Sequence, residues 1–134
     1  MDRNPVVLCI DSDRTGLMIR RAVLETAQYT ILTAPDASFA LAIMRSIPVD
    51  ILITEQSLPS MTGVELAKQC KRLRPQTRVM LLTSSPYYPP SNDVDEQFCK
   101  LEGPVAMLEK VAELATRRKP MARAMAVAAA ASAA

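Results

Sequence analysis

The hydrophobic positions along the chain alternate between short apolar runs and longer amphipathic stretches. Five short runs are rich in β-branched or other apolar residues, which is typical of strands buried inside a sheet. These predicted strands cover residues 5–10, 29–33, 50–54, 78–83 and 97–99. Between them, apolar residues recur at helical spacing. The predicted helices cover residues 13–27, 63–73 and 104–117, together with one that starts at Ala37 and ends near Pro48.

Apolar residues recur at helical spacing in the first, third and last of these helices, and the first two helices have an aspartate at the expected start. Asp13 or Ser12 is predicted to cap the first helix, and Asp36 precedes the second. The first helix is predicted to bury Gly16, Ile19, Val23, Leu24 and Ala27. The last helix is predicted to bury Val105, Leu108, Val111, Ala112 and Ala115, with Pro104 in its first turn.

The alternation of strands and helices predicts an α/β fold, with a parallel sheet covered by helices on both faces. One helix of that repeating pattern is missing from the sequence. Residues 84–96 contain Pro86, Pro89 and Pro90 and no apolar periodicity. Proline removes a backbone donor and clashes with the preceding helical turn. We therefore predict a loop there, with the fourth helix of the fold degraded.

The length of the chain fits one domain, followed by a short tail. We predict a domain over residues 1–119 and an Ala-rich tail over residues 120–134, which begins at Pro120. The first residues lack the features of a secretory signal peptide, and no apolar run is long enough to span a bilayer. These observations predict a cytoplasmic protein that does not enter a membrane.

Composition excludes several kinds of chemistry. The chain has no histidine, and its three cysteines are far apart, so we expect free thiols and neither a zinc site nor a catalytic triad. Three glycines cannot build a Gly-rich phosphate loop. Residues 117–134 hold four of the 16 basic residues and none of the 14 acidic ones. Residues 1–116 therefore contain 12 basic and 14 acidic residues, which gives them a net charge of −2. A near-neutral body with few aromatic residues argues against nucleic-acid binding.

Polar residues follow the predicted strands where a parallel sheet gathers its functional groups, at the carboxyl ends. Asp11, Ser12 and Asp13 follow the first strand, and Glu55 ends the third. Thr83 with Ser84 ends the fourth strand, and Lys100 follows the fifth. The sequence thus predicts carboxylates, a hydroxyl and an ammonium group at one edge of the sheet.

This order of residues resembles the receiver domain of response regulators, the module of two-component signalling. The resemblance covers residues 5–118, and its best stretch is 50–63, where Pro59 and Gly63 follow Glu55 at the family's spacing. It implies a flavodoxin-like sheet of order 2-1-3-4-5. It also implies that Glu55 stands at the phosphoacceptor position, that Thr83 is the switch hydroxyl, and that Lys100 pairs with the phosphoryl group. Mg²⁺ would be held by the acids after the first strand.

The chain departs from the family pattern at several of these positions. Glu55 replaces an aspartate, and Ser12 replaces the second acid of the metal-binding pair. Leu101 stands where a proline is usual, and Gln97 stands where the family has an aromatic switch residue. A glutamate projects one methylene further than an aspartate, and displacements of that order impair in-line attack. Asp11 is left as the main Mg²⁺ ligand, so we expect weak Mg²⁺ binding and no other cofactor.

The sequence therefore predicts a stand-alone pseudo-receiver in phosphorelay signalling, which is not an enzyme and acts by contact with a protein partner. The partner would be a signalling component such as a histidine kinase or another regulator, and Tyr87 and Tyr88 are candidate contacts. Glu55 either mimics the phosphorylated state by meeting Lys100 and Thr83, or forms a plain ion pair at a degenerate site. The alternatives are a receiver phosphorylated weakly or elsewhere, and a flavodoxin-like enzyme.

Overall fold

A computed structural model defines residues 4–86 and 89–116 of the chain. Its centre is a five-stranded sheet of order β2-β1-β3-β4-β5 in which all neighbouring strands are parallel. The strands are β1 (Val6–Ile10), β2 (Thr30–Ala34), β3 (Ile51–Glu55), β4 (Arg78–Thr83) and β5 (Glu96–Cys99). The helices are α1 (Arg14–Leu24), α2 (Ala37–Ser46), α3 (Gly63–Leu73) and α4 (Gly103–Thr116), and a 3₁₀ turn, η1, covers Lys100–Glu102.

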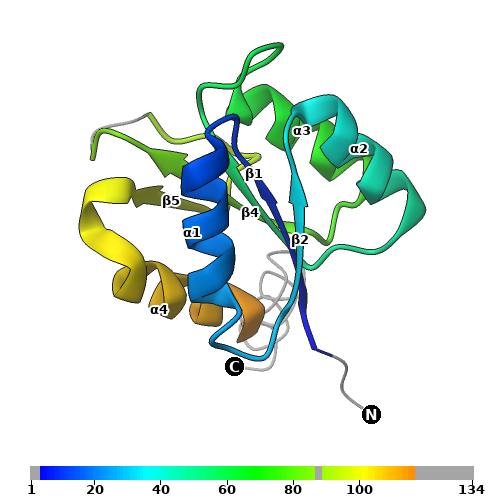
Figure 1. Cartoon of the computed structure of the whole chain (residues 1–134). Helices are drawn as coiled ribbons and strands as arrows, with labels where there is room; N and C mark the ends of the chain where they lie inside the picture. The colour runs from blue at the N-terminus through cyan, green and yellow to red at the C-terminus, as the bar shows by residue number, and fades with distance from the viewer. Residues whose placement is uncertain (1–3, 87–88, 117–134) are drawn as a thin grey trace, which may run out of the picture.

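The helices cover both faces of the sheet, α1 and α4 on one side and α2 and α3 on the other (Figure 1). The order 2-1-3-4-5 and the doubly wound α/β architecture predicted from the sequence are confirmed. The predicted bounds of α3 and β4 agree with the structure, and those of the other elements differ by a few residues at their ends. The predicted domain boundary after residue 119 lies outside the described residues and stays a prediction.

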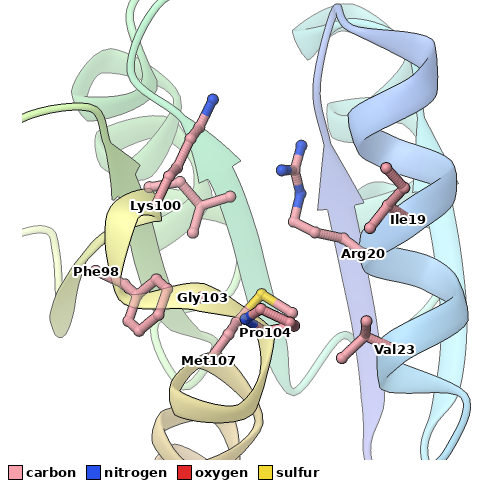
Figure 2. A pocket seen from close by; sticks show the side chains of 9 residues that line it. Ile19, Arg20, Val23, Phe98, Lys100, Gly103, Pro104 and Met107 are labelled. Carbon is pink, nitrogen blue, oxygen red and sulfur yellow. The ribbon is translucent and has the colours of Figure 1, made fainter.

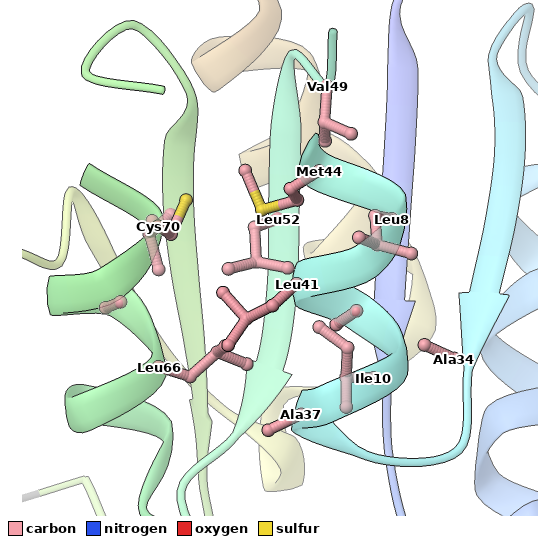
Figure 3. Close-up of a cluster of buried hydrophobic side chains, with 13 residues drawn as sticks. Leu8, Ile10, Ala34, Ala37, Leu41, Met44, Val49, Leu52, Leu66 and Cys70 are labelled. Carbon is pink, nitrogen blue, oxygen red and sulfur yellow. The ribbon is translucent and has the colours of Figure 1, made fainter. Parts of the chain in front are cut away.

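Successive residues of the central strands face opposite sides of the sheet and build two cores. The core under α2 and α3 contains Leu8, Ile10 and Leu52, packed against Leu41 and Leu66 (Figure 3). The core under α1 and α4 contains the alternate strand positions, together with residues of both helices. Its buried members are Val7, Cys9, Leu24, Ile51, Ile53, Met80, Leu82, Phe98, Met107, Val111 and Leu114. Burial on both faces explains why the central strands read as continuous apolar runs.

The starts of three helices follow from capping residues in the sequence. The Asp13 side chain accepts a hydrogen bond from the backbone N–H of Thr15, and Asp36 accepts one from Phe39. Thr62 caps α3 in the same way. Such side chains satisfy backbone donors that have no partner inside the helix. Asp13, one of the two predicted caps of the first helix, is thereby confirmed.

The predicted buried stripes of α1 and α4 are partly wrong. In α1, Ile19 is 58% exposed, whereas Leu17 and Arg20 lie on the inner side of the helix with Val23 and Leu24. In α4, Val105 is 69% exposed, and the buried residues are Met107, Val111 and Leu114. Apolar residues on several sides of a helix allow more than one stripe, and packing against the sheet selects one of them.

The connection between β4 and β5 has no helix in its described parts, residues 84–86 and 89–95. The three prolines explain this, as the sequence predicted. The end of the connection is held by Asp95, whose Oδ2 accepts hydrogen bonds from the Lys71 ammonium and the Val79 backbone N–H, both at 2.7 Å. Gln97 donates a side-chain hydrogen bond of 2.7 Å to the carbonyl of Pro89. Side-chain contacts thus fix the start of β5 against α3 and β4.

Replacing Lys71 by methionine is expected to lower the free energy of unfolding by about 1–2 kcal/mol. The substitution removes the ammonium group from Asp95, whose side chain is only 11% exposed, and keeps most of the apolar stem. Urea unfolding followed by circular dichroism measures the loss. Lys68→Met, at an exposed position of the same helix, is the matched control and should change stability by less than about 0.5 kcal/mol. Equal effects of the two variants would contradict a role for the Lys71–Asp95 pair.

No helix in the described part of the chain has the length and apolar character needed to cross a bilayer. The three cysteines, Cys9, Cys70 and Cys99, are free and buried, as the sequence predicted. Burial raises the pKa of Cys9 and of Cys70 to about 12, so these thiols stay protonated at neutral pH.

Candidate functional site

The carboxyl ends of the strands bring four of the predicted site residues to one edge of the sheet. Asp11 follows β1 directly, Glu55 is the last residue of the neighbouring strand β3, and Thr83 ends β4. Asp11 is 3% exposed and Glu55 is 8% exposed. Lys100, which follows β5, forms an ion pair between its ammonium group and the Glu55 carboxylate. The predicted proximity of Glu55 and Lys100 is therefore present in the structure.

A fifth residue, Arg20 of α1, completes this cluster, and the sequence analysis did not identify it. Its guanidinium group forms an ion pair with Asp11, and its Nη2 lies 3.7 Å from Oε1 of Glu55. The Arg20 side chain is 13% exposed. Burial lowers the pKa of Arg20, and the charge of Glu55 opposes that shift. The buried edge thus holds two cations against two carboxylates, with Arg20 lying between the ends of β1 and β3.

The sequence contained a signal for Arg20. The residue lies three positions before Val23 and four before Leu24, on the side of α1 that packs against the sheet. A charged residue inside an apolar stripe is unusual unless its charge is paired, because an unpaired buried charge is costly. Asp11 and Glu55, predicted at the ends of the first and third strands, were the acids available to pair with Arg20. The interpretation of Ile19 as a buried residue concealed this arrangement.

The acids that hold Mg²⁺ in the family do not fit a metal ion here. Oδ1 of Asp11 accepts a 2.8 Å hydrogen bond from the backbone N–H of Asp13, and Oδ2 is paired with Arg20. Ser12 is exposed, and Asp13 is exposed and caps α1. Hard divalent cations need several oxygen ligands, and a guanidinium group beside the acids repels them. No group of three metal-ligating side chains occurs among the residues that the structure describes.

The side chains of the predicted switch residues donate their hydrogen bonds to backbone carbonyls of the β4–β5 connection and not to Glu55. The Thr83 hydroxyl donates a 2.8 Å hydrogen bond to the backbone carbonyl of Ser85. A hydroxyl has one proton to donate, so Thr83 does not donate to the Glu55 carboxylate. Gln97 lies on β5 and donates to the carbonyl of Pro89. Tyr87 and Tyr88, the predicted partner contacts, lie outside the described residues.

The loop after β3 is shaped around the backbone of Glu55 and Gln56. The backbone N–H of Gly63 donates a 2.9 Å hydrogen bond to the Gln56 carbonyl, and the Val64 N–H donates to Oε1 of Gln56 at 3.1 Å. A Cβ atom at position 63 would collide with the Glu55 carbonyl oxygen and lie 2.7 Å from Cδ1 of Leu81. Gly63 is therefore needed for close approach of the backbone, which explains why a glycine stands at this distance from Glu55 in the sequence.

Comparison with known proteins agrees with this geometry. A family model described as the response regulator receiver domain matches residues 7–91, which is more than half of the chain. The chain is 25% identical over 100 residues to the alkaline phosphatase synthesis transcriptional regulatory protein PhoP of Bacillus subtilis, a match that covers 75% of this chain and 38% of that protein. It is 30% identical over 76 residues to the hydrogenase transcriptional regulatory protein HoxA of Cupriavidus necator, which covers 56% and 15% respectively. The chain spans well under half the length of these relatives.

Solved structures share the fold over almost the whole described chain. The signal receiver domain of an HD domain-containing protein from Pseudomonas fluorescens is 26% identical, with a TM-score of 0.79 and coverage of 86% of this chain and 89% of that one. The chemotaxis response regulator CheY4 of Vibrio cholerae is 22% identical, with a TM-score of 0.76 and coverage of 83% and 98%. At that level of identity the second likeness concerns the fold alone.

Proposed function

The chain belongs to the family of response regulator receiver domains, and we propose that it acts in two-component signalling by contact with a protein partner, without accepting a phosphoryl group at Glu55. Receiver domains interact with other proteins in signalling. The residues around Glu55 support the proposal that an internal ion-pair cluster has replaced phosphoryl chemistry in this member of the family.

The observation that carries the proposal is the pairing of both buried carboxylates with cations of the chain itself. Glu55 pairs with Lys100, and Asp11 pairs with Arg20, which also lies near Glu55. In phosphoryl transfer, metal ions and cationic side chains stabilise the charge that develops on the phosphoryl oxygens. Here the two cations already neutralise the carboxylates, so little positive charge is left for an incoming phosphodonor.

The position of Glu55 also disfavours it as a nucleophile. Its side chain is 11% exposed, and both cations, Lys100 and Arg20, lie against its Oε1 atom. Attack on phosphorus requires a carboxylate oxygen that is free, accessible and in line with the leaving group. An approach to Glu55 would first have to separate it from Lys100, which is 40% exposed, or from Arg20.

The hypothesis that Glu55 mimics the phosphorylated state requires contacts of Glu55 with both Lys100 and Thr83. Only the contact with Lys100 agrees with it. The other half of that hypothesis required a contact with Thr83, whose hydroxyl instead donates to Ser85. The geometry therefore supports a stable internal ion pair over an imitation of the active state. The match to the receiver family leaves the flavodoxin-like enzyme without support.

We propose a protein partner from the same signalling system, such as a histidine kinase or another regulator. A receiver that takes no phosphoryl group cannot report a phosphorylation state, so its partner would recognise a surface that does not depend on phosphorylation. A phosphoryl group that does not bind cannot shift an equilibrium between two conformations.

Treatment of the protein with acetyl phosphate and Mg²⁺ is expected to give no phosphorylated species. The physical reason is the neutralised and sequestered Glu55 carboxylate together with the engaged oxygens of Asp11. Intact mass spectrometry measures the result, because one phosphoryl group adds ~80 Da. A phosphorylatable receiver treated in parallel serves as the positive control. An adduct that maps to Glu55, or to another residue in the site, would contradict the proposal.

A further inference from the structure

A small pocket opens between α1 and α4, directly below the ion-pair cluster (Figure 2). Its volume is about 150 Å³, and its wall is mostly apolar. The lining residues come from α1, β4, β5, η1 and the first part of α4, and those that the argument uses are Arg20, Val23, Phe98, Lys100, Gly103 and Met107. An apolar cavity of this size accommodates a molecule about as large as benzene.

The pocket stays open because the residues near its mouth do not fill it. Gly103 has a φ angle of 87°, a conformation that favours glycine, and no atom lies within 4 Å of where its Cβ would stand. The large side chains on either side, Leu101 and Val105, are 83% and 69% exposed. They therefore extend into solvent instead of covering the space beside Gly103.

One end of the pocket is lined by two cationic side chains, Arg20 and Lys100, both of which are paired with carboxylates of the chain. Figure 2 shows Arg20 of α1 and Lys100, the first residue of η1, on opposite sides of this end of the pocket, with both side chains extending toward the same edge of the sheet. Lys100 is paired with Glu55, yet its side chain remains 40% exposed, and an ammonium group has three donors. An apolar slot of this size, ending at a partly exposed ammonium group, has the recognition chemistry of a small amphipathic acid.

We propose that this pocket binds a small monocarboxylate with an aromatic or branched apolar body. The apolar body lies between Val23, Phe98 and Met107, and the carboxylate accepts a hydrogen bond from Lys100. The ligand carboxylate and Glu55 then share one ammonium group. Occupancy of the pocket is thus coupled to the ion-pair cluster, which gives the domain an input that needs no phosphoryl group.

Sodium benzoate is the probe, because one ring fills the pocket and one carboxylate meets Lys100. We expect benzoate to shift the methyl NMR signal of Met107 with a dissociation constant on the order of 1 mM, the affinity that nine non-hydrogen atoms can provide. Met44 belongs to the core on the opposite face of the sheet, so its methyl signal is the internal control and should not move. Benzyl alcohol has the same ring without the charge and should bind more weakly.

Three variants and one control separate the charge from the apolar slot. Lys100→Met should weaken benzoate binding about tenfold, since it removes a charge-assisted hydrogen bond, and leave benzyl alcohol unaffected. Glu55→Gln removes the competing carboxylate and should strengthen benzoate binding by about fivefold. Filling the slot with Val23→Phe should abolish the binding of both ligands. Ile43→Phe, in α2 on the opposite side of the sheet, is its matched control.

Several outcomes would overturn the proposal. These are an unmoved Met107 signal at benzoate concentrations well above the expected constant, equal shifts at Met44, or equal benzoate affinity in the wild type and Lys100→Met. A pocket that receives only a side chain of a protein partner would give the first of these. The measurements use no phosphodonor, so their failure leaves the proposed function untouched.

Discussion

A variant with Arg20→Ala, Ser12→Asp and Glu55→Asp is expected to bind Mg²⁺ on the order of 100-fold more tightly than the wild-type chain. Arg20→Ala removes a cation that is paired with Asp11 and lies 3.7 Å from Glu55. Ser12→Asp adds a carboxylate beside Asp11, and Glu55→Asp shortens the third acid. The site then has two more units of negative charge with which to attract a divalent ion. Ser12→Asp adds one, and the loss of Arg20 unmasks the charge of Asp11.

The informative comparison is with the double variant that retains Arg20. Ser12→Asp with Glu55→Asp restores aspartate in the metal-binding pair and at the phosphoacceptor position, two of the positions at which the chain departs from the family. Because Arg20 still neutralises Asp11 in the double variant, we expect only a small gain in Mg²⁺ affinity until the guanidinium group is also removed. Isothermal calorimetry measures affinity, and acetyl phosphate with intact mass spectrometry tests whether the triple variant also accepts a phosphoryl group.

Arg20→Ala alone controls for a general loosening of the site. That variant leaves Asp11 buried at 3% exposure without its cation, so it should be less stable than the wild type and gain Mg²⁺ affinity only modestly. If the double and triple variants bound Mg²⁺ equally, Arg20 would not be the group that excludes the metal. If the wild type bound Mg²⁺ tightly, the assignment of the Asp11 oxygens would be wrong.

Gly63→Ala is expected to lower the free energy of unfolding by about 3 kcal/mol, the largest stability effect we anticipate from a single methyl group in this protein. The added Cβ would overlap the carbonyl oxygen of Glu55 and lie 3.0 Å from its carbonyl carbon. Both are backbone atoms of a central strand, which cannot rotate away as a side chain can. The start of α3 or the end of β3 must move, which also displaces the Glu55 carboxylate from Lys100.

Gly16→Ala is the matched control for this prediction. Its Cβ would meet side-chain oxygens, Oδ2 of Asp13 at 3.0 Å and Oδ2 of Asp11 at 3.3 Å. Side chains can adjust, and alanine favours the helix over glycine by about 1 kcal/mol, so stability should change by less than that. Urea unfolding of both variants measures the difference. Similar losses at the two positions would show that the backbone contact at Gly63 is not the cause.

Much of the candidate site could be predicted because strand ends have fixed places in a parallel sheet. Once the strands of residues 5–10 and 50–54 were recognised as buried, Asp11 and Glu55 had to lie at the same edge. Lys100 followed from the same reasoning. Arg20 could not be placed so simply, because it reaches the edge from the second turn of α1. Its role depends on the rotation of that helix about its axis, which the apolar pattern left ambiguous between Ile19 and Leu17.

The sequence by itself determined the α/β architecture, the absence of a helix from the described parts of the β4–β5 connection, and the polar groups that follow the strands at the edge of the sheet. These features depend on local causes: continuous apolar runs, capping aspartates, and prolines that cannot continue a helix. Only the tertiary structure decided which charges neutralise which. Arg20, Lys100, Asp11 and Glu55 come from four separate segments, and ion pairing depends on distances of a few ångströms and on shared burial. Such distances are set by the packing of α1 and α4 against the sheet, and no single stretch of sequence contains them.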